Sequence, residues 1–210
     1  MQISELQPID GVILAGGLAR RMGGGDKGLR LLAGQPVLGH VIARLQPQVT
    51  ELILNANGDP GRFASFGLPV TPDSISDHPG PLAGILAGLD YLAAQRSTVG
   101  WLVTAPGDCP FLPADLVSRL VVGLQPACKA AVARYRQRLQ PVCGLWSVAL
   151  RADLRQAVVE DGVRRVEDWL QRCEAARVDF PEMAVDPFFN VNSPDDLEAA
   201  AALLVQPPLR

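Results

Sequence analysis

The chain has 210 residues, 48% of them hydrophobic and 20% charged, with a formal net charge of −3 at pH 7. This length can bury a full core, and we expect one domain over residues 1–210. The small net charge gives no indication of a nucleic-acid or membrane surface. Four scattered cysteines without a C-x-x-C pair, no signal peptide and no long apolar span predict a cytoplasmic protein with reduced thiols.

The first predicted strand is the buried run Val12-Ile13-Leu14, and a glycine-rich loop follows it directly. This loop begins at Gly16-Gly17 and ends at Lys27. Glycines lack a Cβ atom, so successive backbone N–H groups can turn inward as an anion site, and Arg21 and Lys27 add positive charge. The sequence therefore predicts a phosphate-binding loop.

Two common phosphate-binding motifs do not fit this loop. A Walker A loop has lysine directly after its last glycine and Ser or Thr directly after lysine, whereas the order here is Asp26-Lys27-Gly28. Gly23, Gly25 and Gly28 match G-x-G-x-x-G, but eight residues separate Leu14 from Gly23, whereas the dinucleotide fingerprint follows its strand immediately. This displacement disfavours a dinucleotide-dependent oxidoreductase. A glycine-rich surface turn without function is the remaining alternative.

Polar residues follow the next two predicted strands. A helix is predicted from Pro36, and the strand at residues 51–54 after it leads into Asn55. Open α/β sheets bind ligands at the carboxyl ends of their strands, which is where these amides lie. The alternative is that Asn-Gly only forms a turn, and this explains Asn57 better than Asn55. A short strand at residues 68–71 leads into Asp73. A helix from Pro81 then carries small residues that indicate close packing on a flat surface.

The strand predicted at residues 101–105 ends in Pro106-Gly107-Asp108-Cys109-Pro110, which holds one carboxylate at a rigid exit from the sheet. Such a carboxylate suits Mg²⁺, which commonly uses one or two protein carboxylates together with substrate phosphates. The alternative, a helix cap, fails because the two prolines at 110 and 113 delay the next helix.

Beyond residue 124, strands are predicted at 130–133 and 139–146, and Pro141 indicates an edge strand or a bulge. Two amphipathic helices and a strand at 178–180 follow. In Phe189-Asn190-Val191-Asn192 the two amides alternate with an apolar residue, and Ser193 is the predicted cap of the last helix. Strands that alternate with helices imply a mostly parallel sheet covered on both faces, so we predict a single-domain, three-layer α/β/α sandwich.

The pattern L-A-G-G-x-x-x-R-M-G-G-x-D-K after the first strand resembles the signature loop of nucleotidyltransferases with a Rossmann-like, glycosyltransferase-A-like fold. It is most similar to the molybdenum cofactor guanylyltransferase branch, since cytidylyltransferase relatives usually carry L-A-A-G. P-x-D-x-P at Asp108 and the tail Asn190-Val191-Asn192 agree, and the resemblance covers about residues 9 to 200. It implies a nucleotide-binding part at residues 9–124 and an acceptor-binding part at residues 125–204.

The resemblance implies transfer of GMP from GTP to molybdenum-molybdopterin, with release of pyrophosphate. The acceptor's phosphate would attack the α-phosphorus in line, so positioning and charge stabilisation suffice without a nucleophilic side chain. Lys27 and Asp108 are the expected catalytic residues, with Asp108 binding the cofactor Mg²⁺. We expect Asn190 and Asn192 to contact molybdopterin rather than GTP; the alternative for Asn192 is a helix-capping role.

The full set of expected binding residues is Leu14, Ala15, Gly16, Gly17, Arg21, Lys27, Asn55, Asp73, Asp108, Asn190 and Asn192. Expected partners are GTP, molybdenum-molybdopterin, and proteins that deliver molybdopterin or mature molybdoenzymes; nucleic acid and membrane are not expected, and the chain is expected to be a monomer. A cytidylyltransferase or sugar-nucleotide transferase of the same fold is the alternative. A regulatory nucleotide-binding module is a third hypothesis, but it would not need Asp108.

Overall fold

The computed structural model of the chain describes residues 8–16, 26–75, 80–95 and 98–205. Its main sheet has seven strands in the order β5-β4-β1-β6-β8-β7-β9. These strands are β1 (Ile9–Leu14), β4 (Leu52–Asn55), β5 (Val70–Thr71), β6 (Trp101–Pro106), β7 (Ala130–Tyr135), β8 (Arg138–Ser147) and β9 (Ala176–Asp179), and a separate hairpin pairs β2 (Leu31–Leu32) with β3 (Gln35–Pro36).

The sheet is mostly parallel, as the sequence predicts. β5, β4, β1 and β6 pair in parallel, β8 runs antiparallel to both β6 and β7, and β9 is parallel to β7. The central strands β1 and β4 are short, buried and apolar apart from Asp10 and Asn55, which is typical of parallel strands covered by helices. Strand boundaries differ only slightly from the prediction; Phe180, for example, lies just past the end of β9.

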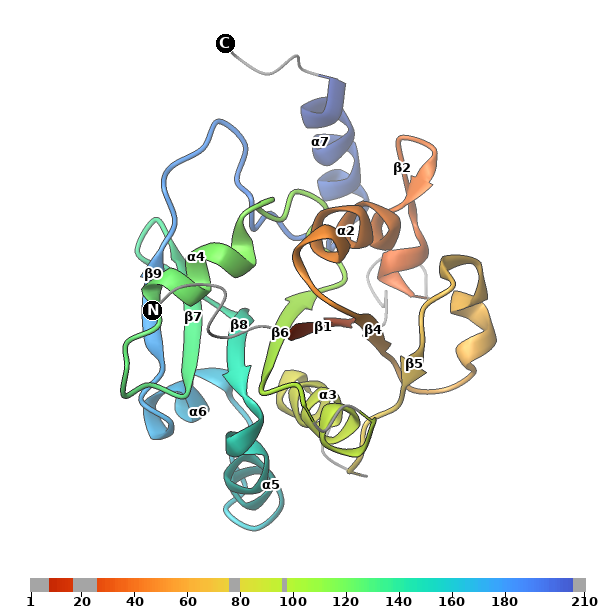
Figure 1. Cartoon of the computed structure of the whole chain (residues 1–210). Helices are drawn as coiled ribbons and strands as arrows, with labels where there is room; N and C mark the ends of the chain where they lie inside the picture. Colours follow the sequence, from red (N-terminus) through yellow and green to blue (C-terminus); the bar gives the residue numbers. More distant parts are fainter. Residues whose placement is uncertain (1–7, 17–25, 76–79, 96–97, 206–210) are drawn as a thin grey trace.

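Helices cover both faces, so the predicted three-layer sandwich is confirmed (Figure 1). α2 (Val37–Leu45) and α4 (Leu116–Gly123) pack on one face, while α3 (Pro81–Gln95), α5 (Arg151–Val159) and α6 (Val166–Arg172) pack on the other. α7 (Pro194–Val205) lies beside the β2–β3 hairpin. Single-turn or short 3₁₀ segments are η2 (Lys27–Leu29), η3 (Gln46–Gln48), η4 (Pro60–Phe66) and η5 (Val148–Leu150).

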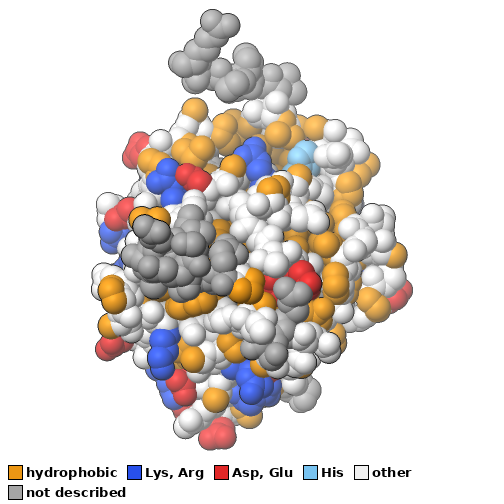
Figure 2. All heavy atoms as spheres, in the orientation of Figure 1, with side chains coloured by type: hydrophobic (Ala, Val, Ile, Leu, Met, Phe, Trp, Pro, Cys, Tyr) orange, Lys and Arg blue, Asp and Glu red, His pale blue; other side chains and the backbone are white. Residues whose placement is uncertain are grey.

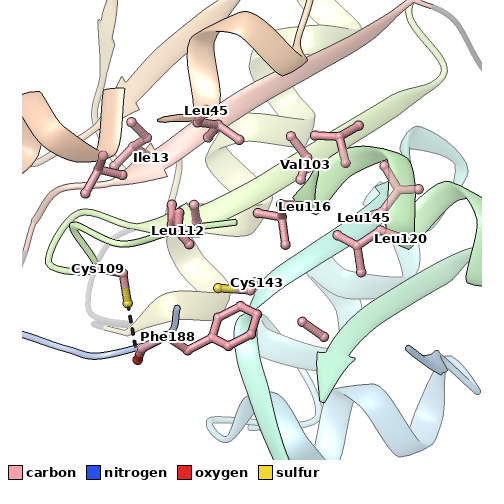
Figure 3. Packing of buried hydrophobic residues seen from close by; sticks show 14 of the residues in the cluster. Ile13, Leu45, Val103, Cys109, Leu112, Leu116, Leu120, Cys143, Leu145 and Phe188 are labelled. Carbon is pink, nitrogen blue, oxygen red and sulfur yellow. Dashed lines mark hydrogen bonds between the residues drawn. The ribbon is translucent and has the colours of Figure 1, made fainter. Parts of the chain in front are cut away.

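The core divides into one apolar cluster on each face of the sheet. On the α2 and α4 face, Leu45 and Leu116 meet strand residues such as Val103, and the cluster continues to Cys109 and Phe188 (Figure 3). On the other face, Ile85 of α3 belongs to a cluster with the tryptophans of β8 and α6, Trp146 and Trp169. Packing on both sides therefore holds the sheet rigidly, and this fixes the positions of the loops at the strand ends.

Pro141 lies in an interior strand, and the structure decides between the two predicted readings. β8 is flanked by β6 and β7, so an edge position is wrong. The register shifts between the pairs Val132–Gly144 and Ala133–Gln140, which leaves Pro141 in a bulge. Buried Thr104 of β6 donates from Oγ1 to the Val142 carbonyl at 2.5 Å and thereby satisfies a group that the bulge removes from the ladder.

The surface shows mixed charge on the face of Figure 2, where Lys, Arg, Asp and Glu side chains are interspersed with hydrophobic and neutral ones. Positive charge that acts on a ligand there must come from individual side chains rather than from a broad field. Among the described helices, none combines the length and the apolarity needed to cross a bilayer.

Candidate active site

A pocket opens at the carboxyl ends of β1, β4 and β6, where the chain changes direction across the sheet. From β1 the chain passes through α2 on one face to reach β4, whereas α3, on the opposite face, leads to β6. Such a switch point leaves a crevice outside the strand ends, which is the usual ligand site of open α/β sheets. The pocket here measures about 390 Å³.

Most of the predicted site residues line this pocket, although they come from loops far apart in the sequence. They are Leu14, Ala15, Gly16, Lys27, Asn55, Asp73, Asp108 and Asn190. Asn192 joins the site through a hydrogen bond to Lys27. Gly17 and Arg21 lie outside the described residues.

Lys27 and Asp108 form the charged centre of the pocket. Lys27 Nζ lies 4.0 Å from Asp108 Oδ2 and donates to Asn192 Oδ1 at 2.6 Å. Both side chains are only partly exposed, 25% for Lys27 and 21% for Asp108. The ammonium is therefore held between a carboxylate and an amide, yet it remains reachable from the pocket, where a ligand phosphate can contact it.

Close backbone packing fixes the Asp108 carboxylate at the exit of β6. The Gly107 N–H donates to the Leu14 carbonyl at 3.0 Å, and a Cβ on Gly107 would stand only 3.2 Å from that oxygen. On the other side, the Val191 N–H donates to the Asp108 carbonyl at 2.9 Å. Burial raises the pKa of Asp108, and Lys27 together with a backbone N–H partly offsets that rise.

A second polar cluster joins the ends of β4 and β5. Asn55 Nδ2 donates to Asp73 Oδ1 at 3.0 Å, and Asn57 Nδ2 donates to Asp73 Oδ2 at 2.7 Å. The Asp73 N–H in turn donates to Asn57 Oδ1 at 2.8 Å. Asn57 is thus more than the turn residue that the sequence suggests. The signal in the sequence that could have predicted this role is Asn55-Ala56-Asn57, in which a single residue separates two amides at the end of a strand.

Helix α3 approaches this cluster so closely that only glycine fits. A Cβ on Gly84 would lie 2.4 Å from Asn55 Oδ1 and 2.9 Å from Leu14 Cδ2. The predicted close packing of this helix is confirmed, and its role at the site is to hold the Asn55 amide in place.

Arg62 of η4 is a site neighbour that sequence reasoning missed. Its Nη2 donates to the Asn57 carbonyl at 2.5 Å. Its Nε lies 2.9 Å from Asp26 Oδ2, an ion pair whose N–H direction misses the oxygen, so it contributes charge attraction rather than a hydrogen bond. Arg62 therefore links the β4 loop to the residue that precedes Lys27. No local pattern around Arg62 signals this contact, because its partner lies in a different loop.

The tail amides take two different places. Asn190 lines the pocket, with its Oδ1 accepting from Cys109 Sγ at 3.2 Å. The Asn192 amide serves Lys27, so the alternative in which it caps α7 is wrong; Ser193 Oγ is the cap and accepts from the Asp196 N–H at 3.2 Å. Asp196 Oδ2 accepts from the Asn192 N–H at 2.9 Å, which fixes the backbone beside Lys27.

The model of the MobA-like NTP transferase domain matches residues 11–176. The chain belongs to this family. A molybdenum cofactor guanylyltransferase of Nitrobacter hamburgensis is 52% identical over 200 residues, covering 95% of this chain and 96% of the relative. Another of that name, from Rhodopseudomonas palustris, is 49% identical over 207 residues, covering 98% and 99%.

Solved structures agree on the architecture. A molybdopterin-guanine dinucleotide biosynthesis protein A of Archaeoglobus fulgidus superposes with a TM-score of 0.73 at 23% identity, covering 93% of this chain and 98% of that one. A 4-diphosphocytidyl-2C-methyl-D-erythritol synthase of Anaerococcus prevotii reaches 0.72 at 14% identity, covering 96% and 98%. These likenesses show the shared fold.

Family membership decides the class of activity. The MobA-like family consists of NTP transferases, so this chain is a nucleotidyltransferase, and the resemblance stated from the loop motif is confirmed. The reading as a dinucleotide-dependent oxidoreductase and the reading as a surface turn are both set aside. Gly16, where the predicted glycine loop begins, lines the pocket.

Proposed function

We propose that the protein transfers GMP from GTP to the terminal phosphate of molybdenum-molybdopterin, releasing pyrophosphate and forming the guanine dinucleotide cofactor. The observation that carries this proposal is the pairing of Lys27 with Asp108, 4.0 Å apart, in the lining of the pocket at the strand ends. The names of the most similar curated relatives, which match this chain over nearly its full length, favour guanylyl transfer and this acceptor.

Lys27 supplies the positive charge for the triphosphate. The ammonium has an amide and a carboxylate as its neighbours, and its third N–H is left for a phosphate oxygen. Phosphoryl transfer asks the protein mainly for positioning and charge stabilisation, which a lysine held at two points provides without a nucleophilic side chain.

Mg²⁺ is the proposed cofactor, and the residues present fit it. Asp108 offers a carboxylate in a poorly solvated place where burial raises its pKa, so a cation bound there would compensate a charge that Lys27 compensates only in part. No cluster of three or more potential ligands occurs among the described residues, which agrees with a site completed by triphosphate oxygens. When bound, Mg²⁺ neutralises charge on the phosphates.

The nucleoside is assigned to the cluster at the ends of β4 and β5. Asp73 has both carboxylate oxygens engaged by the amides of Asn55 and Asn57, so the group is held in one orientation. Carboxylate and amide oxygens accept hydrogen bonds from ribose hydroxyls or from the N1–H and N2–H₂ donors of guanine. Leu14, Ala15 and Gly16 add backbone contacts along one wall of the pocket.

The alternative is a cytidylyltransferase or sugar-nucleotide transferase of the same fold, which would use Lys27 and Asp108 in the same way. The deciding experiment measures pyrophosphate release with each of the four NTPs and Mg²⁺, with and without molybdopterin. We expect release with GTP that depends on molybdopterin. Release with CTP would sink the guanylyl assignment, and release with GTP and a sugar phosphate instead of molybdopterin would sink the acceptor assignment. Either result would favour the alternative.

The cellular setting follows from the same proposal. All four cysteines are free thiols, which suits the reducing cytoplasm. A monomer that receives molybdopterin from a delivery protein and passes the dinucleotide to maturation proteins completes the proposed scheme.

A further inference from the structure

A second cavity, of about 350 Å³, lies next to the nucleotide pocket. The two cavities share one wall residue, Asn190. Strand β8 runs along both of them, since Val142 in its bulge lines the first and Gln140, just before the bulge, lines the second. Because of the bulge, Gln140 and Val142 of one strand line two adjoining cavities, and the second cavity is an extension of the first.

The lining of this second cavity combines aromatic rings, amides and arginines. Phe189 contributes a partly exposed ring, while the rings of Tyr135 and Phe188, whose centroids are 5.8 Å apart, are buried beside it. Gln140 and Asn190 contribute amides, and Arg136 and Arg138 contribute guanidinium groups. Rings and guanidinium planes stack on flat heteroaromatic groups, amides match their mixed donor and acceptor edges, and guanidinium groups bind anionic substituents.

Arg138 is the guanidinium that is available to a ligand. It is exposed and has no hydrogen bond or ion pair within the described part of the chain. Arg136, by contrast, lies over the Tyr135 ring, 5.2 Å from its centroid, and its Nε is 3.9 Å from Glu182 Oε1. The acidic group of this cavity, Asp186, uses its Oδ1 to accept from the Phe188 N–H at 2.8 Å. Arg138 thus brings an uncompensated positive charge to the rim.

The hairpin that carries these arginines is strained at its tip. Its two turn residues, Arg136 and Gln137, have φ of 47° and 63°, in the left-handed region where glycine and asparagine are usual. A side chain in the left-handed region is disfavoured because its Cβ atom comes close to the following carbonyl oxygen. The short turn keeps Arg138 at the first position of β8, directly above the cavity. Strain of this kind is concentrated at ligand sites.

We propose that this second cavity binds the end of the acceptor that lies away from the reacting phosphate, a flat heteroaromatic group with anionic substituents, and that Arg138 selects for its charge. This inference rests on the proposed function, because the acceptor's phosphate must reach Lys27 while the rest of the molecule extends past Asn190. In molybdenum-molybdopterin, the pterin would meet the Phe189 ring and the amides, and the anionic metal-dithiolene group would meet Arg138.

The test compares Arg138→Gln with Arg138→Lys and with the control Arg177→Gln. Arg177 is an exposed arginine on β9, the strand on the other side of β7, and it lines neither cavity. Metal-free molybdopterin binding, followed by pterin fluorescence with GTP present, should weaken about tenfold or more in Arg138→Gln, because a charge-assisted contact is lost. Arg138→Lys should restore part of the affinity. GTP affinity by calorimetry and the melting temperature should match wild type.

The outcomes separate the two proposals. Wild-type protein that neither binds molybdopterin nor releases pyrophosphate with it overturns the proposed function, and this inference falls with it. Wild-type protein that turns over molybdopterin while Arg138→Gln binds it as tightly as Arg177→Gln overturns this inference alone. Weakened GTP binding in Arg138→Gln would also overturn it, since the second cavity would then belong to the nucleotide.

Discussion

At the scale of single residues, Asp108 is the most consequential side chain of the site. We expect Asp108→Asn to abolish nearly all Mg²⁺-dependent pyrophosphate release, because a neutral amide replaces the charged ligand proposed for the metal. Thermal unfolding should stay close to wild type, since burial already disfavours the ionised carboxylate. Asp115→Asn is the matched control, because Asp115 is exposed and paired with Arg119. Wild-type-like release by Asp108→Asn would remove the metal assignment.

A variant of Lys27 can distinguish stabilisation of the transition state from binding of the substrate. Lys27→Ala should lower kcat by about a hundredfold, the typical loss when one group that stabilises developing charge is removed. The measurement is steady-state pyrophosphate release over a range of GTP concentrations. A change confined to KM would instead show that the ammonium binds substrate and transition state equally well.

The two tail amides require separate variants, because the contact between Lys27 and Asn192 makes them unequal. Asn190→Ala should leave GTP·Mg²⁺ affinity unchanged by calorimetry and weaken molybdopterin binding. Asn192→Ala should in addition lower kcat, since the lysine loses the amide that positions it. If GTP affinity fell in Asn190→Ala while molybdopterin still bound, the assignment of Asn190 to the acceptor would be contradicted.

At the scale of elements, the packing of α3 against the sheet connects stability with nucleotide binding. Gly84→Ala places a methyl group 2.4 Å from Asn55 Oδ1, whereas Gly88→Ala places one 2.7 Å from Leu102 Cδ2, away from the site. Both variants should lose about 1 to 3 kcal/mol of unfolding free energy through overpacking. Urea unfolding measures this loss, and calorimetry measures GTP affinity. Only Gly84→Ala should also weaken GTP binding, and equal GTP affinity in the two variants would refute the role of Asn55.

At the scale of the whole molecule, the cysteines report how cooperatively the core opens. Cys109 and Cys143 lie in the cluster beneath α4 and are almost fully buried (Figure 3). Burial raises the pKa of both thiols, so the reactive thiolate is scarce in the folded protein. Cys173 is partly exposed, and burial raises its pKa to about 11.

We therefore expect alkylation at pH 8, followed by mass spectrometry, to modify the partly exposed Cys128 first and Cys173 more slowly. Cys109 and Cys143 should react only across the denaturant transition, because their exposure requires global unfolding. Labelling of Cys109 in native conditions at the rate of Cys128 would show that the segment between β6 and α4 opens on its own.

The sequence by itself determined the fold class, the order of the main strands and helices, and the family. Hydrophobic periodicity is local and repeats, so the strands ending at Leu14 and Asn55 and the helix from Pro81 were all predictable. The strand exit that carries Asp108 was predictable too, because a short strand followed by Pro106-Gly107 ends sharply at a fixed spacing. The sequence could not decide whether Pro141 lies in an edge strand or in a bulge, because the answer depends on which strands flank β8.

Only the tertiary structure decided how the site residues meet. Lys27 contacts Asn192, which lies 165 residues away in the sequence. Arg62 contacts Asn57 and Asp26. The missing side chain of Gly84 leaves space for the Asn55 amide. The cavity bearing Arg138 likewise exists only because the β7–β8 hairpin and the segment before α7 fold onto each other. The physical reason is that a sequence pattern records the local preferences of the backbone, whereas contacts between distant loops are set by how rigid layers pack.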